Sequence, residues 1–147
     1  MKYSNRWCVY SYRLFLCTLT IMVLFTTVFA TDIAPYASKY ISSYDRYIWR
    51  NTDGSIGVEF DITGTGTMDQ IGATKIVIQR QSGNSWIDVK TYTSSTTSAL
   101  MGTNTYYHTA SVTYYGATSG YSYRARISIY AGNSSGSDSR VITTTTA

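Results

Sequence analysis

A single histidine limits the catalytic chemistry that this chain offers. A Ser–His–acid hydrolase would need His108, the only histidine, together with one of the many serines and an acid such as Asp88 or Asp138. No serine stands in a pattern that marks it as activated. His108 falls in a predicted strand beside Tyr106 and Tyr107, which is typical of an exposed strand residue. We therefore expect no enzymatic activity.

Two carboxylates offer a second kind of chemistry. Glu59 and Asp61 are two residues apart on one predicted strand, so both point to the same side of a sheet. Glycosidases place two acids about 5–9.5 Å apart, which this pair could match. The strand alternation assigns both to the solvent face, which explains them without a pocket. With one histidine and no acids at calcium-loop spacing, we expect neither a metal nor a cofactor.

Exposed aromatic residues favour binding over catalysis. Rings at outward or edge positions of predicted strands could stack on sugars; they are Trp49, Trp86, Tyr107, Tyr115 and Tyr130. The same rings could instead stabilise the sheet through cross-strand pairs. We predict a non-enzymatic module that interacts with an unknown extracellular or cell-envelope protein. Carbohydrate binding is the alternative, and a hydrolase is a more distant one.

The elements that position these residues follow an N-terminal targeting segment. Residues 1–13 carry three basic residues and no acid, and residues 14–30, LFLCTLTIMVLFTTVFA, carry no charge. Small residues three positions and one position before the Ala30–Thr31 bond complete the pattern of a helical secretory signal peptide over residues 1–30. This predicts a secreted protein. The alternative is a membrane-tethered protein with an uncleaved anchor, because the apolar run is near the lower limit of about 17–25 residues for a span.

Removal of residues 1–30 would change the bulk properties of the chain. Three of the twelve basic residues and none of the eight acidic ones lie there, so the net charge would fall from +4 to +1. Near-neutral charge without a basic cluster argues against a nucleic-acid partner. Cys8 and Cys17, the only cysteines, also lie there. The secreted domain would therefore be disulfide-free and held together by its core.

The remaining sequence is typical of β structure. Strong helix formers are scarce, with one Glu and one Leu after residue 30. We predict a flexible lead-in over 31–43 and one domain over 44–147. Turn signals divide this domain into seven strands, at 44–50, 55–63, 74–81, 85–92, 106–115, 121–131 and 138–145. Residues 64–73 are expected to form a crossover loop in which Met68 and Ile71 plug the core. Such spacing predicts an all-β fold, a single antiparallel β-sandwich, with a small closed barrel as the alternative.

One tyrosine favours the sandwich over the barrel. Tyr123 opens the sixth predicted strand shortly after a glycine, where a tyrosine corner of an immunoglobulin-like domain would lie. Tyr121 could fill the same role. Alternation along this strand predicts that both tyrosines point inward.

Two segments resemble a known family. TGTMDQIGATKIVIQRQSGNSWIDVKTY (63–92) and YSYRARISIYAGNSSGSDSR (121–140) are similar to small secreted proteins of Gram-positive, clostridia-type bacteria. The resemblance extends over 44–147 and implies secretion, but the family has no established activity and so implies no site residues. More loosely, YRARISIYAG (123–132) is similar to the sixth strand of fibronectin type III domains, which implies a fold and not a function.

Overall fold

The computed structural model describes residues 38–147, which form one antiparallel sheet of six strands. The strands are β1 (Ile41–Arg50), β2 (Ile56–Ser82), β3 (Ser85–Thr93), β4 (Met101–Tyr114), β5 (Tyr123–Asn133) and β6 (Gly136–Thr143). A 3₁₀ turn, η1 (Ser98–Leu100), precedes β4. The predicted all-β, antiparallel class is confirmed. The predicted signal peptide, its Ala30–Thr31 cleavage site and residues 31–37 of the lead-in lie outside the described residues.

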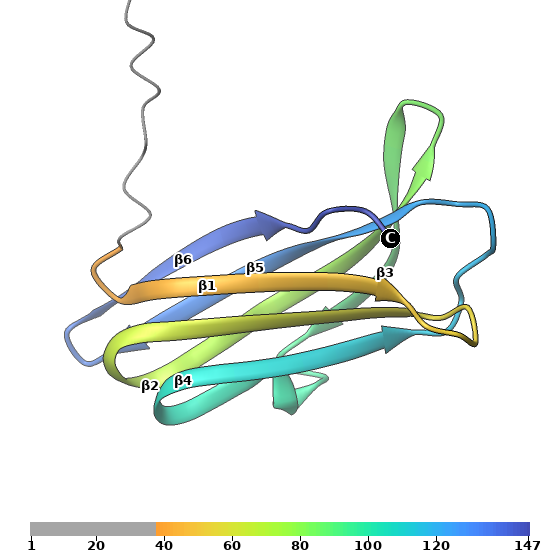
Figure 1. The fold of residues 1–147 in the computed structure, drawn as a ribbon. Coiled ribbons are helices and arrows are strands. Elements are labelled where there is room, and N and C mark those ends of the chain that lie inside the picture. The colour runs from red at the N-terminus through yellow and green to blue at the C-terminus, as the bar shows by residue number, and fades with distance from the viewer. Residues whose placement is uncertain (1–37) are drawn as a thin grey trace, which may run out of the picture. The chain divides into compact units, whose positions relative to one another are not determined.

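Strand β2 makes two layers out of one sheet. Its N-terminal half, residues 56–63, pairs with β1 on one side and β4 on the other. Its C-terminal half, residues 75–82, pairs with β3 and β5, and β6 extends that layer beyond β5. Figure 1 shows β2 curling back on itself between the two halves. Gly64 permits this bend, because a Cβ at that position would lie 2.9 Å from the carbonyl oxygen of Gly66.

The structure has six strands where seven were predicted, because β2 contains two of the predicted strands. Residues 64–73 were expected to form a loop between them, but they stay extended and pair with β4 and β5. The Gly-Thr-Gly-Thr pattern at 64–67 was interpreted as a turn; it forms a bulge that curves the strand without ending it. Met68 and Ile71 are fully buried, as predicted for residues that plug the core.

Strand β1 begins three residues earlier than predicted, so residues 41–43 of the expected lead-in belong to the sheet. Contacts with the β5–β6 hairpin hold the start of this strand. The backbone N–H of Tyr40 donates to a carboxylate oxygen of Asp138 at 3.0 Å, and the Tyr40 hydroxyl donates to the carbonyl of Ser135 at 2.6 Å. Burial of the Tyr40 ring explains the difference, since its apolar surface joins the core.

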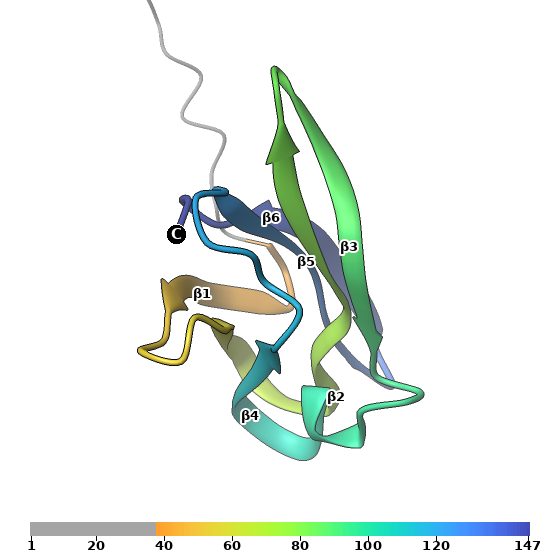
Figure 2. The same ribbon diagram turned by 90° about the vertical axis from the view of Figure 1, so that its right-hand side faces the viewer.

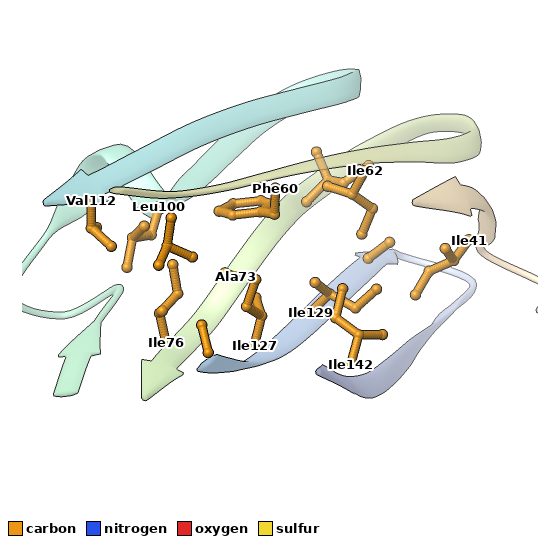
Figure 3. Packing of buried hydrophobic residues seen from close by; sticks show 14 of the residues in the cluster. Ile41, Phe60, Ile62, Ala73, Ile76, Leu100, Val112, Ile127, Ile129 and Ile142 are labelled. Atoms are coloured by element: carbon orange, nitrogen blue, oxygen red, sulfur yellow. The ribbon is translucent and has the colours of Figure 1, made fainter. Parts of the chain in front are cut away.

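The core fills the space between the two layers, as Figure 3 shows. Apolar residues at alternate positions of β2 and β5 point into it and are at most 1 % exposed; they include Ile56, Val58, Phe60 and Ile62 of the first layer, and Ile76, Ile78, Ile127 and Ile129 of the second. One inward prediction is wrong, because Tyr121 is 46 % exposed. Tyr121 precedes β5, so the strand alternation does not extend to it.

Side chains and the C-terminal tail close the side of the fold between β1 and β6, where the strands do not pair. The Arg46 Nε donates to the carbonyl of Thr143 at 2.7 Å. The tail then runs beside β5, because Tyr123 and Ala147 exchange two backbone hydrogen bonds, each 3.0 Å long. Figure 2 shows the two layers from the side, with the β2–β3 hairpin projecting beyond them.

Candidate functional site

The outer face of the first layer gathers aromatic and acidic side chains. Alternation along β2 points its apolar residues inward, so Glu59 and Asp61 point outward as predicted. The strand register places Tyr47 opposite Glu59 and Asp45 opposite Asp61. We call this surface the acidic aromatic face; its residues are Asp45, Tyr47, Trp49, Glu59, Asp61 and Tyr107.

Its three rings are accessible, and specific contacts hold two of them. Trp49 lies over Gly57, where an added Cβ would overlap the indole ring, and the indole Nε1 donates to Asn51 Oδ1 at 2.7 Å. The Tyr107 hydroxyl donates to Asp61 Oδ1 at 3.0 Å. Trp49 is 38 % exposed, Tyr107 42 % and Tyr47 48 %. Of the five predicted ligand-stacking residues, only Trp49 and Tyr107 lie on this face, Trp49 opposite Gly57 and Tyr107 opposite Thr63 of β2.

Among residues 38–147, the six residues of the acidic aromatic face include three acids and no lysine or arginine. Asp45 and Asp61 are direct cross-strand partners, an arrangement of like charges that destabilises a sheet. The neighbouring Asp45 carboxylate raises the pKa of Tyr47, and the hydrogen bond to Asp61 raises that of Tyr107. The arginines of β1 turn away: Arg46 reaches β6, and Arg50 donates to the carbonyl oxygens of Gly54 and Tyr121.

A second aromatic site surrounds Tyr130 on β5. An added Cβ at Gly132 would overlap the Tyr130 hydroxyl, so this side chain extends over the glycine. Tyr130 and Gln70 both line two adjoining shallow hollows of about 320 and 370 Å³. The other lining residues are mostly hydroxyls, amides and one acid: Thr74, Ser94, Ser95 and Met101 in the first hollow, and Asp69, Thr103, Asn104, Gly132 and Asn133 in the second. Asn104 adopts a left-handed backbone conformation, with φ of 52°.

The remaining two predicted aromatic residues stand apart. Tyr115 follows β4 and is 79 % exposed. Trp86 is half-buried on β3, where the Arg124 guanidinium lies 4.3 Å from its ring centroid. The Arg124 Nε donates to Gln79 Oε1 at 2.8 Å, and Gln79 Nε2 donates to Asp88 Oδ1 at 2.6 Å. Trp86 thus belongs to a cross-strand network that ties β5, β2 and β3 together.

The residues considered for a hydrolase do not converge. His108 lies on β4, half-buried, which corrects the expectation of an exposed residue. The alternation of side chains along β4 places His108 on the inner side of the strand. There its Nε2 is 2.9 Å from the Ala99 carbonyl oxygen, and the centroid of its ring is 6.0 Å from that of the Phe60 ring. Asp88 contacts Gln79, and Asp138 binds the start of β1. Within residues 38–147, no three His, Cys, Asp or Glu side chains are placed to hold a metal ion.

Tyr123 has the geometry of a tyrosine corner. It is 1 % exposed at the start of β5, and its hydroxyl accepts a hydrogen bond of 2.8 Å from the backbone N–H of Thr118, five residues upstream. The Tyr114 ring packs at 6.2 Å from the Tyr123 ring. The contacts of Tyr123 are structural, and they fix the connection between β4 and β5.

The sequence analysis missed Asp45 and Tyr47, although a signal for them was present. Asp45, Tyr47 and Trp49 stand at alternate positions of one strand, which places them on one face. Their convergence with Tyr107 depends on the pairing of β2 with both β1 and β4, which periodicity within one strand does not specify.

The described residues thus define an all-β protein whose single antiparallel sheet folds into two layers. No family model, curated protein or solved structure matches the chain. In the part of the chain that the structure describes, no helix is long and apolar enough to cross a membrane.

Proposed function

We propose that this chain is a non-enzymatic extracellular interaction module that binds a cationic segment of a protein partner through the acidic aromatic face. The observation that carries the proposal is the placement of Tyr47, Trp49 and Tyr107, all exposed, beside three carboxylates on one sheet face. A lysine or arginine would gain cation–π contact with a ring and an ion pair with a carboxylate at the same time. It would also relieve the repulsion between Asp45 and Asp61.

The extracellular setting of the proposal rests on the N-terminal sequence. The basic, apolar and small-residue regions of residues 1–30 are those of a secretory signal peptide. The resemblance of residues 44–147 to small secreted proteins of clostridia-type bacteria supports the same setting, and a fibronectin type III-like strand at 123–132 suits a binding module. We therefore place the partner outside a Gram-positive cell, in the medium or the cell envelope.

Titration of the isotope-labelled chain with a synthetic arginine-rich peptide tests the proposal. We expect the amide shifts to cluster on β1, the N-terminal half of β2 and β4. Tyr47→Ser and Asp45→Asn should each weaken binding about tenfold, because each removes one of the two favourable contacts. Tyr115→Ser and Asp69→Asn are the matched controls, since they remove an exposed ring and an exposed acid from other surfaces. Equal effects of these controls, or shifts spread over both layers, would contradict the proposal.

Carbohydrate binding at Tyr130 is the second candidate function. Its supporting observation is the Tyr130 side chain extending over Gly132 between two hollows that hold the amides of Gln70, Asn104 and Asn133. An aromatic ring can stack on a sugar ring, and amides beside it can form hydrogen bonds with the sugar hydroxyls. Titration with soluble peptidoglycan fragments and neutral oligosaccharides separates the two candidates. Shifts confined to β5, the start of β4 and residues 69–74 of β2, lost in Tyr130→Ser and kept in Tyr47→Ser, would favour carbohydrate binding.

A further inference from the structure

Strand β4 is an edge of the sheet and differs in composition from the other three edges. Within residues 38–147 it pairs with β2 alone, and Figure 1 shows it along the margin of the first layer. Its sequence, MGTNTYYHTASVTY, contains no acid, no lysine or arginine and no proline. The other edge strands β1, β3 and β6 each carry both an acid and a basic residue. Charges and prolines are the usual protection of an edge against pairing with another strand, so β4 lacks that protection.

Existing hydrogen bonds show which backbone groups of β4 point away from β2. The hydroxyl of Thr105 bonds the N–H and the carbonyl of Tyr107, and the Tyr92 hydroxyl donates to the carbonyl of Thr113 at 2.8 Å. Residues of an antiparallel strand turn alternately toward one neighbour and the other. The odd-numbered residues between these two, Thr109 and Ser111, therefore direct their N–H and carbonyl groups to the open edge.

The opposite side of β2 leads to the same assignment. Odd-numbered residues of β2 bond toward β1: the Asn51 N–H donates to the carbonyl of Ser55, and the Thr65 N–H donates to the carbonyl of Tyr40. The even-numbered residues of β2 consequently face β4 and pair with even-numbered partners, such as Phe60 with Ala110. Thr109 and Ser111 are left without a strand partner among the described residues.

We infer that this edge pairs with the same segment of a second copy of the chain, antiparallel about a twofold axis near Ala110. That axis places Thr109 opposite Ser111 of the other copy, and Tyr107 opposite Thr113. Each Thr109–Ser111 pair exchanges two backbone hydrogen bonds, as hydrogen-bonded antiparallel pairs do. All four residues are uncharged and three are good strand formers, so the pairing opposes no like charges. A symmetric dimer with one self-complementary patch is the commonest assembly of identical chains.

Sheet extension would also double the ligand surface, although the inference does not depend on the proposed function. Outward side chains stay outward across a continuous sheet, so the two acidic aromatic faces would lie on the same side. Tyr107 of each copy would lie next to the junction, because it is on β4 itself. A partner with repeated cationic segments would then bind two sites with a gain in avidity.

Measurement of mass in solution tests this inference. The chain is expressed from its full sequence, purified as the host processes it, and followed by light scattering and sedimentation from micromolar to millimolar concentration. We expect the mass to rise toward twice that of one chain. Amide exchange at Thr109 and Ser111 should slow as the concentration rises, because these N–H groups become bonded.

Two substitutions at one position, with a matched control, locate the interface. Ser111→Pro removes an N–H that faces the open edge and leaves the ladder with β2 intact, and Ser111→Lys adds a charge to the same edge. Each should raise the dimer dissociation constant about thirtyfold or more, because both copies carry the change. Ser43→Lys, on the outer face of β1, should leave dimerisation unchanged. Circular dichroism verifies that all three variants fold.

The inference is overturned by a wild-type chain that stays monomeric to millimolar concentration, or by a dimer that persists in both Ser111 variants. Peptide binding distinguishes it from the proposed function. Ser111→Pro should weaken the dimer and keep the affinity of each chain for the arginine-rich peptide within about twofold, since it adds no charge beside Glu59, the cross-strand partner of Ser111.

Discussion

The indole ring of Trp49 covers the α-carbon of Gly57, its direct partner in the ladder between β1 and β2. A side chain at position 57 would occupy the space of that ring. The glycine therefore decides where the tryptophan lies, and through it the shape of the acidic aromatic face.

Gly57→Ala should displace the indole from the sheet. Position 57 has an ordinary strand backbone conformation, so the effect comes from the overlap with Trp49 and not from the backbone. Overpacking of this kind costs about 1–3 kcal/mol, and we expect a loss of unfolding free energy in that range. The measurement is urea denaturation followed by tryptophan fluorescence, with the arginine-rich peptide titrated in parallel, where binding should weaken about tenfold.

Gly66→Ala is the matched control for this substitution. Gly66 lies in the same strand, and an added Cβ there meets no atom within 4 Å. Its unfolding free energy and peptide affinity should equal those of the wild type. A Gly57→Ala variant with wild-type stability and fluorescence would show that the indole does not rest on the glycine in solution.

Tyr123→Phe should weaken the tyrosine corner while keeping the ring. The substitution removes the acceptor of the Thr118 N–H, and the ring remains packed beside Tyr114. Loss of one such hydrogen bond costs about 1–2 kcal/mol, measured as a shift in the urea midpoint. Tyr121→Phe is the control, because Tyr121 is 46 % exposed and its ring contact with Arg80 survives the change. Equal midpoints for the two variants would contradict a stabilising role of the Tyr123 hydroxyl.

Periodicity within a strand predicts the fold class and the core well, because alternation depends only on neighbouring residues. Ile56, Val58, Phe60 and Ile62 point inward as the pattern indicates. The same pattern does not distinguish a turn from a bulge. The glycines at 64 and 66 suit either, and only the continued pairing of residues 68–73 with β4 and β5 shows that the strand is unbroken.

The candidate site was predicted less well, because it depends on which strands are neighbours. Trp49, Trp86, Tyr107, Tyr115 and Tyr130 were grouped by residue type and outward position, yet they occupy four separate surfaces. The acidic aromatic face forms where β1 and β4 pair with the same half of β2. That arrangement depends on the curling of β2, which no local sequence pattern predicts.

Arg124→Lys should loosen the network around Trp86. A lysine retains the charge but lacks both the planar group that stacks on the indole at 4.3 Å and the Nε that bonds Gln79. We expect a loss of about 1 kcal/mol, measured by urea denaturation, with a change in the Trp86 fluorescence. Arg126→Lys, on the same strand and exposed, should be neutral. Unchanged peptide binding in both variants would separate this face from the acidic aromatic face; weakened binding in Arg124→Lys would contradict that separation.

Asp138 makes the start of β1 sensitive to acid. Hydrogen bonds from Ser38 and from the backbone N–H of Tyr40 hold the pKa of this carboxyl below its ordinary value of 3.8. A lowered folded-state pKa means that the carboxylate stabilises the fold above the unfolded-state pKa, and that this contribution is lost as the pH falls through the folded-state value.

The wild type should therefore be more stable than Asp138→Asn at pH 7. The difference should shrink below about pH 4, because the variant has no group to titrate there. Urea midpoints of both proteins across this range give the measurement, and Asp69→Asn, an exposed acid on β2, is the control. A wild-type advantage that stays constant from neutral to acid pH would show that the Asp138 charge does not hold the strand.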